Sequence, residues 1–461
     1  MEKDPKTVPA DDQNGQKTYS RVRYVAVKLL SRYERSDSYI DKLLQHEFSF
    51  GDFSAQDRAL LTELVNGVIR HRGKIDWVLN GFYNGDYQKC LNIIKNAMRI
   101  GLYQVLFLNK IPIPVAINES VEIIKKIQGE RIAGIVNGVL RNIARNIDNI
   151  RYPNPKEDLV YYFSVIYSHP KWMVKRWIER YGAEFAEQLL MANNRRPYLP
   201  LRVNLLRSTP EEIKGIFSEH NVAFRELPFI PESIILDAPK FDIAQTDIFK
   251  TGKVTVQDPS ASLAAKLAAP AKGSRVIDLC AAPGGKAFFL AELSGDEGEV
   301  VAVDKYGSKL KFIFEGAARL GLKSITTQVE DARNVLAREP FDLVFTDVPC
   351  SGLGTLSKKP DIKWKREPED IMKIVILQRE IMETAARLVK PGGVFLYSTC
   401  TIEPDENSRN VDWFLQNFPE FELDPAENHL PAEVCKDGFM QTFPNVHGVD
   451  GAFAARMIKK A

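Results

Sequence analysis

The strongest constraint on the fold is a regular alternation of short β-branched runs and helix-length segments, which begins at about Thr251. The runs are SRVIDL, EVVAVD, ITTQVED, FDLVFTDVP and GGVFLYST. Such alternation is typical of βαβ units, whose strands are parallel. It predicts an α/β domain over residues 251–461 with a mostly parallel, doubly wound sheet. In such sheets ligands bind at the carboxyl ends of the strands, near the point where the strand order reverses.

The chain before this domain divides into three parts. Residues 1–19 are polar and predict a flexible tail. Residues 20–150 carry apolar positions at three- and four-residue spacing, as in RVRYVAVKLLSRY, and predict an all-helical domain. Residues 151–250 combine two strand-like runs, PLRVNLLR and SIILD, with an N-capped helix in STPEEIKGIFSEH. This last pattern predicts a small α+β module.

The charge balance conceals a basic N-terminal part. The 62 Lys and Arg almost cancel the 60 Asp and Glu, giving a net charge of +2, but basic residues outnumber acidic ones over 20–150. A local surplus of this kind favours a surface that binds nucleic acid. Five cysteines in a chain of 461 residues do not indicate a disulfide framework. Because the sequence also shows no signal-peptide pattern and no long apolar segment, we expect a soluble cytoplasmic protein.

Small residues and acids follow the first three runs of the α/β domain. The turn Cys280–Lys286, CAAPGGK, carries two glycines that let a backbone approach a ligand closely. Asp304 ends the second run, where an acid can hold a ribose hydroxyl pair, and Asp331 follows the third, where an acid could accept from an adenine amino group. Each feature alone is typical of a turn or a loop cap, but together they favour a nucleoside-bearing cofactor. The sequence lacks the GxGxxG and GxxxxGK[ST] motifs of dinucleotide and nucleoside triphosphate sites.

Two cysteines follow the fourth and fifth runs. Cys350 comes three residues after Asp347, and Cys400 directly follows GGVFLYST. If the two strands are neighbours, both thiols face one pocket, where a thiolate could act as a nucleophile. A buried structural role is the usual alternative for a cysteine. Zinc binding is poorly supported because the sequence has no CxxC motif or nearby histidine at these cysteines. A Cys–His dyad is poorly supported because no histidine flanks either cysteine.

Two thiols beside such a cofactor would permit methylation of cytosine. A thiolate that adds to carbon 6 makes carbon 5 enamine-like and able to take a methyl group. A second group must then remove the carbon 5 proton so that the thiolate can leave. Asp347 could hold the ring nitrogen edge and stabilise the added state by hydrogen bonding.

The motifs DLCAAPGGK, AVDK, DVPCSGLGT followed by KKPDIKW, and STCTIEPDEN resemble those of the Sun family of RNA cytosine-5 methyltransferases. The segments DRALLTELVNGVIRHRGKIDWVL and AGIVNGVLRNIAR resemble the NusB-type RNA-binding domain of the family's 16S ribosomal RNA branch. The resemblance implies a NusB-like domain over 20–150, an RNA-recognition module over 151–250 and a Rossmann-like, S-adenosylmethionine-dependent methyltransferase domain over 251–461. It further implies 5-methylation of a cytosine in 16S ribosomal RNA.

Two other functions stay open alongside this one. The same chemistry could act on transfer RNA or another ribosomal site, and the NusB-like segments argue for the ribosomal branch. A catalytically silent RNA-binding assembly factor is the alternative from another class, and the presence of both Cys350 and Cys400 argues against it.

The resemblance also assigns site residues one at a time. Cys400 in the TC motif would be the nucleophile, and Cys350 in the PC motif would assist proton removal and product release. Asp304 would lie on the ribose, Asp331 near the adenine and Asp347 between cofactor and base. The turn that would line S-adenosylmethionine consists of Cys280, Ala281, Ala282, Pro283, Gly284, Gly285 and Lys286.

The expected partner is RNA, namely 16S ribosomal RNA, without membrane or metal, and the expected state is a monomer. Arg202 and Asn204 fall where the family's middle module faces RNA. Five basic residues of the helical domain are hypothesised to contact phosphates, the alternative being a solvated helix face. These are Arg70, Arg72, Lys74, Arg141 and Arg145.

Overall fold

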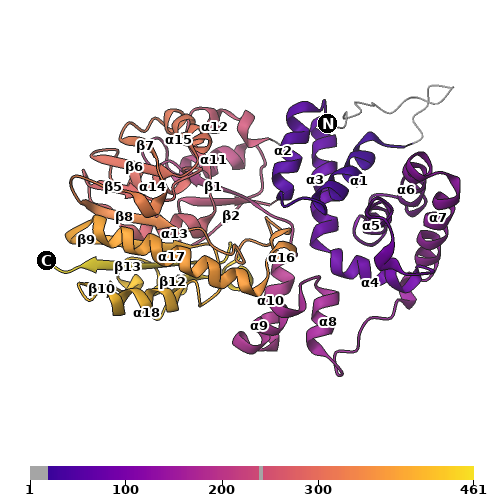
Figure 1. The fold of residues 1–461 in the computed structure, drawn as a ribbon. Coiled ribbons are helices and arrows are strands. Elements are labelled where there is room, and N and C mark those ends of the chain that lie inside the picture. Colours follow the sequence, from indigo (N-terminus) through magenta and orange to yellow (C-terminus); the bar gives the residue numbers. More distant parts are fainter. Residues whose placement is uncertain (1–18, 238–241) are drawn as a thin grey trace, which may run out of the picture. The chain divides into compact units, whose positions relative to one another are not determined.

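The computed structural model describes residues 19–237 and 242–461 (Figure 1). The predicted tail over 1–19 therefore lies, except for Tyr19, outside the described residues. By internal contacts the chain forms two units. One contains the chain up to Asn194 together with Lys359–Lys365, and the other contains Arg195–Lys358 and Arg366–Ala461. The domain boundaries at 150 and 250 stay a prediction. In the described ranges, every helix falls short of the length or apolar character that a membrane span requires.

The first unit is helical, as the periodicity over 20–150 predicts. One hydrophobic core contains side chains of the first seven helices, and α5 is buried along most of its length because apolar side chains surround it. Arg99 of α5 is nearly buried and pairs with Glu34 and Asp76, which offsets the cost of burying its charge. The helices are α1 (Arg21–Tyr33), α2 (Ile40–Phe50), α3 (Ala55–Arg70), α4 (Arg72–Phe82), α5 (Asn92–Phe107), α6 (Ile113–Gln128), α7 (Glu130–Arg145), α8 (Leu159–Ile166), α9 (Lys171–Tyr181) and α10 (Ala183–Asn193).

A short segment from the second half of the chain completes this unit. It is Lys359–Lys365, which includes α16 (Ile362–Lys365) and, except for Lys365, lies within the KKPDIKW motif. Lys363 Nζ donates to the Arg70 carbonyl at 2.8 Å, and Trp364 Nε1 donates to the Ile69 carbonyl at 2.7 Å. Burial lowers the pKa of Lys363 well below its usual range. The motif therefore serves the packing of the helical unit.

The small α+β module lies in the second unit and is built on a four-stranded antiparallel sheet. The strand order is β2-β3-β1-β4. Thr209 caps α11 by accepting from Glu212 N, as the N-cap pattern predicts. The elements are β1 (Leu199–Val203), α11 (Pro210–Glu219), β2 (Arg225–Glu226), β3 (Ser233–Leu236), α12 (Asp247–Lys250) and β4 (Val254–Val256).

The remaining sheet has the order β11-β12-β13-β9-β8-β5-β6-β7, with β10 paired to β13. The strands β5 to β9 pair in parallel and β13 runs antiparallel to β9, which confirms the predicted doubly wound sheet. The strands are β5 (Arg275–Asp278), β6 (Glu299–Asp304), β7 (Ile325–Val329), β8 (Phe341–Asp347), β9 (Val389–Thr399), β10 (Phe421–Asp424), β11 (Cys435–Lys436), β12 (Phe439–Thr442) and β13 (Ala452–Lys459).

Helices cover both faces of this sheet (Figure 1). Alternate side chains of the strands pack into two separate cores, because successive strand residues point to opposite faces. One core contains side chains of α13 (Pro259–Ala268), α14 (Gly285–Leu293) and α15 (Gly307–Leu320), and the other those of α17 (Pro368–Leu388) and α18 (Ser408–Asn417). The strand order reverses between β5 and β8, so ligands are expected at the carboxyl ends of these two strands.

Candidate active site

The turn between β5 and α14 is shaped for close approach to a ligand. Its backbone is tied to the neighbouring strand by a bond from Ala281 N to the Val303 carbonyl at 2.8 Å. Gly284 has a φ of +111°, a conformation that favours glycine, and a Cβ there would lie 2.6 Å from the Phe288 ring. The whole predicted stretch from Cys280 to Lys286 thus lies at the carboxyl end of the first parallel strand.

Asp278, the last residue of β5, is an acid that the sequence analysis missed. Its side chain is fully buried, Oδ1 accepts from Cys280 N, and Oδ2 has no hydrogen-bond partner among the described residues. Burial, with the charge of Asp347, raises the pKa of Asp278 to about 7. The signal was present, since an acid at a strand end was the criterion that selected Asp304.

The two predicted nucleoside-binding acids lie at the next strand ends. Asp304 is the last residue of β6, and its Oδ1 accepts from Tyr306 N at 2.9 Å. Asp331 follows β7 and bonds Arg333 and, at 3.1 Å, Lys305 Nζ. The Arg333 guanidinium holds the pKa of Asp331 well below its usual range. Both acids therefore also make the loop contacts that the alternative interpretation expected.

Asp347 ends β8 and bonds two side chains. Lys286 Nζ donates to Asp347 Oδ2 at 2.6 Å, and the Ser398 hydroxyl donates to Oδ1 at 3.1 Å. Burial opposes the charge of Lys286, but the carboxylate outweighs it and raises the pKa of the ammonium group. The structure thus joins the Cys280–Lys286 turn and the end of β8 through one charged pair.

The two predicted cysteines come together. Because β8 and β9 are parallel neighbours, their carboxyl ends lie side by side, and the Sγ atoms of Cys350 and Cys400 are 3.1 Å apart. The hydrogen bond to Cys400, with burial, raises the pKa of the Cys350 thiol well above its usual range. Either sulfur can be the donor in this contact, so a proton on one thiol can stabilise a thiolate on the other.

The expectation that Arg202 and Asn204 face RNA is wrong, because both side chains are fully buried. Arg202 pairs with Glu292 of α14 and donates from Nε to Gln257 Oε1 at 2.6 Å. Asn204 donates to the backbone carbonyls of Gly252 and Leu320. These residues fasten the small module to the methyltransferase-like sheet within the second unit.

This correction predicts a stability effect rather than an RNA-binding effect. Arg202→Met leaves Glu292 buried without its cation, so the free energy of unfolding should fall by about 3–5 kcal/mol in denaturant titrations. Adding Glu292→Leu should restore most of that loss, because a buried pair can be replaced by apolar residues at little cost. Weaker RNA binding by Arg202→Met at unchanged stability would contradict the structural role.

The hypothesised phosphate contacts divide into three groups, namely one buried residue, two that contact neighbouring side chains and two that are exposed. Arg70 is buried, with 5% of its surface exposed, so its assignment is wrong. Arg72 pairs with Asp76, and Lys74 Nζ lies 5.1 Å from the centre of the Tyr152 ring. Arg141 and Arg145 are exposed on α7, as are Arg131 and Asn142.

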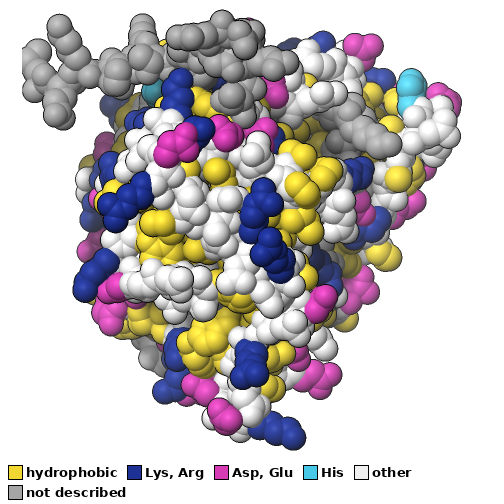
Figure 2. Space-filling model, turned by 90° about the vertical axis from the view of Figure 1, so that its right-hand side faces the viewer, with side chains coloured by type: hydrophobic (Ala, Val, Ile, Leu, Met, Phe, Trp, Pro, Cys, Tyr) yellow, Lys and Arg dark blue, Asp and Glu magenta, His cyan; other side chains and the backbone are white. Residues whose placement is uncertain are grey.

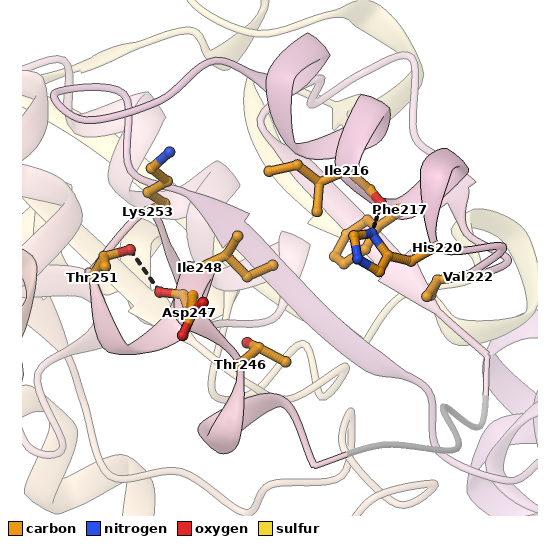
Figure 3. Close-up of a pocket in the computed structure, with 9 residues that line it drawn as sticks. All are labelled: Ile216, Phe217, His220, Val222, Thr246, Asp247, Ile248, Thr251 and Lys253. Carbon is orange, nitrogen blue, oxygen red and sulfur yellow. Dashed lines mark hydrogen bonds between the residues drawn. The ribbon is translucent and has the colours of Figure 1, made fainter.

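A cavity of about 480 Å³ in the small module holds none of the predicted site residues (Figure 3). Apolar side chains from α11 and α12, with Val222, form its walls. The His220 ring contacts the Ile216 carbonyl, and the Thr251 hydroxyl donates to the Asp247 carbonyl, both within their own helical segments. No function is assigned to this cavity.

Three parts of the chain match known families. Residues 265–458 match the family described as 16S rRNA methyltransferase RsmB/F, residues 20–145 the NusB family, and residues 169–243 the ferredoxin-like domain of RsmF/B-like methyltransferases. These matches confirm the predicted combination of an all-helical NusB-like domain, a small α+β module and a Rossmann-like methyltransferase domain.

Whole-chain comparisons agree. The chain is 37% identical over 447 residues to the probable ribosomal RNA small subunit methyltransferase B of Bacillus subtilis, covering 95% of this chain and 99% of the relative. It is 33% identical to ribosomal RNA small subunit methyltransferase B of Salmonella arizonae, covering 88% and 91%. The crystal structure of PH0851 matches with a TM-score of 0.79 and 27% identity, covering 96% of this chain and 100% of the other.

Proposed function

The chain belongs to the RsmB/F family of 16S rRNA methyltransferases, and on that basis we propose that it methylates carbon 5 of a cytosine in 16S ribosomal RNA through a covalent cysteine adduct. The enzyme is an S-adenosylmethionine-dependent RNA methyltransferase. The observation that carries the finer proposal is the 3.1 Å contact between the sulfurs of Cys350 and Cys400. One thiol can attack carbon 6 of the cytosine while the other is already in place to assist release of the methylated base.

The residues at the strand ends fit S-adenosylmethionine. Four carboxylates and the Gly284 turn follow the parallel strands, and the unpaired Asp278 Oδ2 is a buried acceptor without a donor. Partly desolvated carboxylates favour a cationic sulfonium. When bound, S-adenosylmethionine supplies an electrophilic methyl group. The carboxylates that would hold it are Asp278, Asp304, Asp331 and Asp347.

The cysteines divide the covalent chemistry between them. The Cys400 thiolate forms a bond to carbon 6 of the ring, and carbon 5 becomes able to take the methyl group. The Cys350 sulfur, once its own proton has passed to solvent, accepts the carbon 5 proton. The electrons of that carbon–hydrogen bond re-form the ring double bond, and the carbon–sulfur bond breaks with its electron pair returning to Cys400 as a thiolate. The contact between the two sulfurs supports this assignment, because an S–H of Cys350 directed at Cys400 lowers the cost of the attacking thiolate.

Asp347 has the place of a base-orienting group. Its carboxylate lies three residues before Cys350 and is held by Lys286 and Ser398. A carboxylate fixed in this way can hold the nitrogen edge of the base while the ring loses its aromatic character. Lys286 belongs to both the cofactor turn and this pair, so it can align cofactor and base together.

Bisulfite sequencing of ribosomal RNA tests the proposal. Bisulfite converts cytosine but spares 5-methylcytosine, so one cytosine of 16S RNA should lose its protection in a strain without this protein. Expression of the wild-type chain should restore it. Unchanged protection throughout would contradict cytosine-5 activity. If protection were lost only in transfer RNA, cytosine-5 methylation would be supported, but 16S ribosomal RNA would be the wrong substrate.

The exposed arginines of α7 are proposed to contact RNA phosphates. Figure 2 looks onto the side of the helical unit that contains α6 and α7, and basic side chains are scattered there among neutral and hydrophobic surface. Replacing Arg141 and Arg145 by Gln should weaken RNA binding and reduce the salt slope of log K by about 0.7–0.9 for each lost contact. Binding titrations over a range of salt concentrations measure that slope.

Lys89→Gln is the matched control for this experiment. Its side chain is 86% exposed and pairs only with the nearby Asp86 among the contacts described for it. It removes one positive charge from the helical unit outside α7, where the double variant removes two, and we expect an unchanged slope. An unchanged slope in the double variant as well would contradict the α7 contact.

A further inference from the structure

A fully buried polar network joins the two loops that carry the cysteines. Ser351 N donates to Glu406 Oε2 at 2.8 Å, and the hydroxyls of Ser351 and Thr401 are 2.8 Å apart. Ser351 directly follows Cys350, and Thr401 directly follows Cys400. The side chains of Ser351, Thr401 and Glu406 have no exposed surface. The neighbours of the two cysteines are thus bonded to each other away from solvent.

The network also reaches the residue before Cys350. Gln378 of α17 donates from Nε2 to the Pro349 carbonyl at 3.0 Å and to Glu406 Oε2 at 3.1 Å. Asn410 of α18 donates to Gln378 Oε1 at 2.8 Å and so fixes the orientation of the amide. Both residues that flank Cys350 are therefore held, directly or through Gln378, by the Glu406 carboxylate.

Glu406 is an unusual residue to bury. One oxygen accepts two hydrogen bonds, but Oε1 has no hydrogen-bond partner among the described residues. Burial raises the pKa of Glu406. An unsatisfied buried carboxyl oxygen costs free energy, and in a native protein such a group calls for an explanation. The other oxygen gives one, because an apolar side chain in the same space would leave Ser351 N buried without a partner.

The two cysteines depend on this network to different degrees. Cys400 directly follows β9, whose end is paired on both sides, with β8 and with β13. Its carbonyl also accepts from Gly354 N at 3.1 Å. Cys350 lies in the loop beyond β8, where Pro349 and Ser351 bond this network and Arg366 donates to the carbonyls of Cys350 and Ser351. Removing the carboxylate should therefore displace Cys350 more than Cys400.

We propose that Glu406 is a positioning residue that holds the Cys350 thiol at Cys400, and that it acts in product release rather than in attack on the base. This inference rests on the proposed function, because it uses the roles assigned to the two cysteines. Glu406 touches neither the base nor the methyl donor in this proposal, and it acts through the backbone on both sides of Cys350.

The test is accumulation of a covalent protein–RNA adduct with both cysteines present. In Glu406→Ala, Cys400 still attacks but Cys350 is misplaced, so the adduct should appear on denaturing gels. kcat should fall about tenfold to a hundredfold, as for a small misplacement of a reacting group, with little change in the KM for RNA. Glu406→Gln keeps an acceptor for Ser351 N and Gln378, so it should restore kcat and remove the adduct.

Two further variants keep the test decisive. Thr401→Val breaks the second link to Ser351 and should also accumulate adduct, whereas Thr401→Ser should not. Asn204→Ala removes two buried hydrogen bonds elsewhere in the same unit, so it controls for destabilisation and should give no adduct. Thermal unfolding checks that Glu406→Ala and Thr401→Val are folded. If both variants were folded and neither accumulated the adduct, the inference would be overturned.

Cys350→Ala, assayed in parallel, separates this inference from the proposed function. If Cys350→Ala accumulates adduct and Glu406→Ala does not, only the positioning role fails. If Cys350→Ala gives no adduct, the assigned cysteine roles fail and the inference fails with them.

Discussion

Replacing Cys400 by serine is expected to lower methyl transfer to 16S RNA by about 10³-fold or more, as loss of a covalent nucleophile does in other enzymes. A serine hydroxyl ionises far less readily than a thiol and is a weak nucleophile at neutral pH. In the native site the Cys350 and Cys400 sulfurs are 3.1 Å apart, so a proton on Cys350 can stabilise a thiolate on Cys400. Serine has nearly the same shape as cysteine, but it cannot form a thiolate.

Transfer of a labelled methyl group to 16S RNA measures this effect under single-turnover conditions. Cys435→Ser is the matched control, because Cys435 is a half-buried thiol of β11 that lies outside the proposed site and donates to the Leu430 carbonyl at 3.9 Å. The control should methylate at close to the wild-type rate. A Cys400→Ser variant within about tenfold of the wild type would show that another group makes the bond to carbon 6.

The parallel sheet and the meeting of the two thiols could be predicted because they follow from local patterns. Each β-branched run forms a parallel strand, and Cys350 and Cys400 meet once β8 and β9 are neighbours. The same rule should also have found Asp278, since VIDL ends in an acid as EVVAVD does. That omission came from incomplete use of the pattern.

Other features depend on contacts between residues distant in sequence. The sequence pattern around a strand arginine does not show whether the side chain faces RNA or a buried carboxylate. The partner of Arg202 is Glu292, which lies 90 residues away in the sequence. The packing of Lys359–Lys365 into the helical unit joins Lys363 to Arg70, which are 293 residues apart. Such pairings follow from tertiary packing, which local sequence periodicity does not predict.

Cys350→Ala is expected to trap the covalent adduct and to lower turnover by about 10²-fold or more, the usual range for loss of a group that transfers a proton. Attack by Cys400 does not require the second thiol, because Cys400 directly follows β9 and is held by Gly354 N. Removal of the carbon 5 proton does require it, so the reaction should stop after methyl transfer with the carbon–sulfur bond intact.

A shifted band on denaturing gels, carrying labelled RNA in near-equal ratio to protein, measures the trapped species. Adding Cys400→Ser to Cys350→Ala removes the bonding sulfur, so the band should vanish in the double variant. If Cys350→Ala released product at the normal rate without an adduct, the division of roles would be wrong. The 3.1 Å contact would then serve to tune the Cys400 thiolate alone.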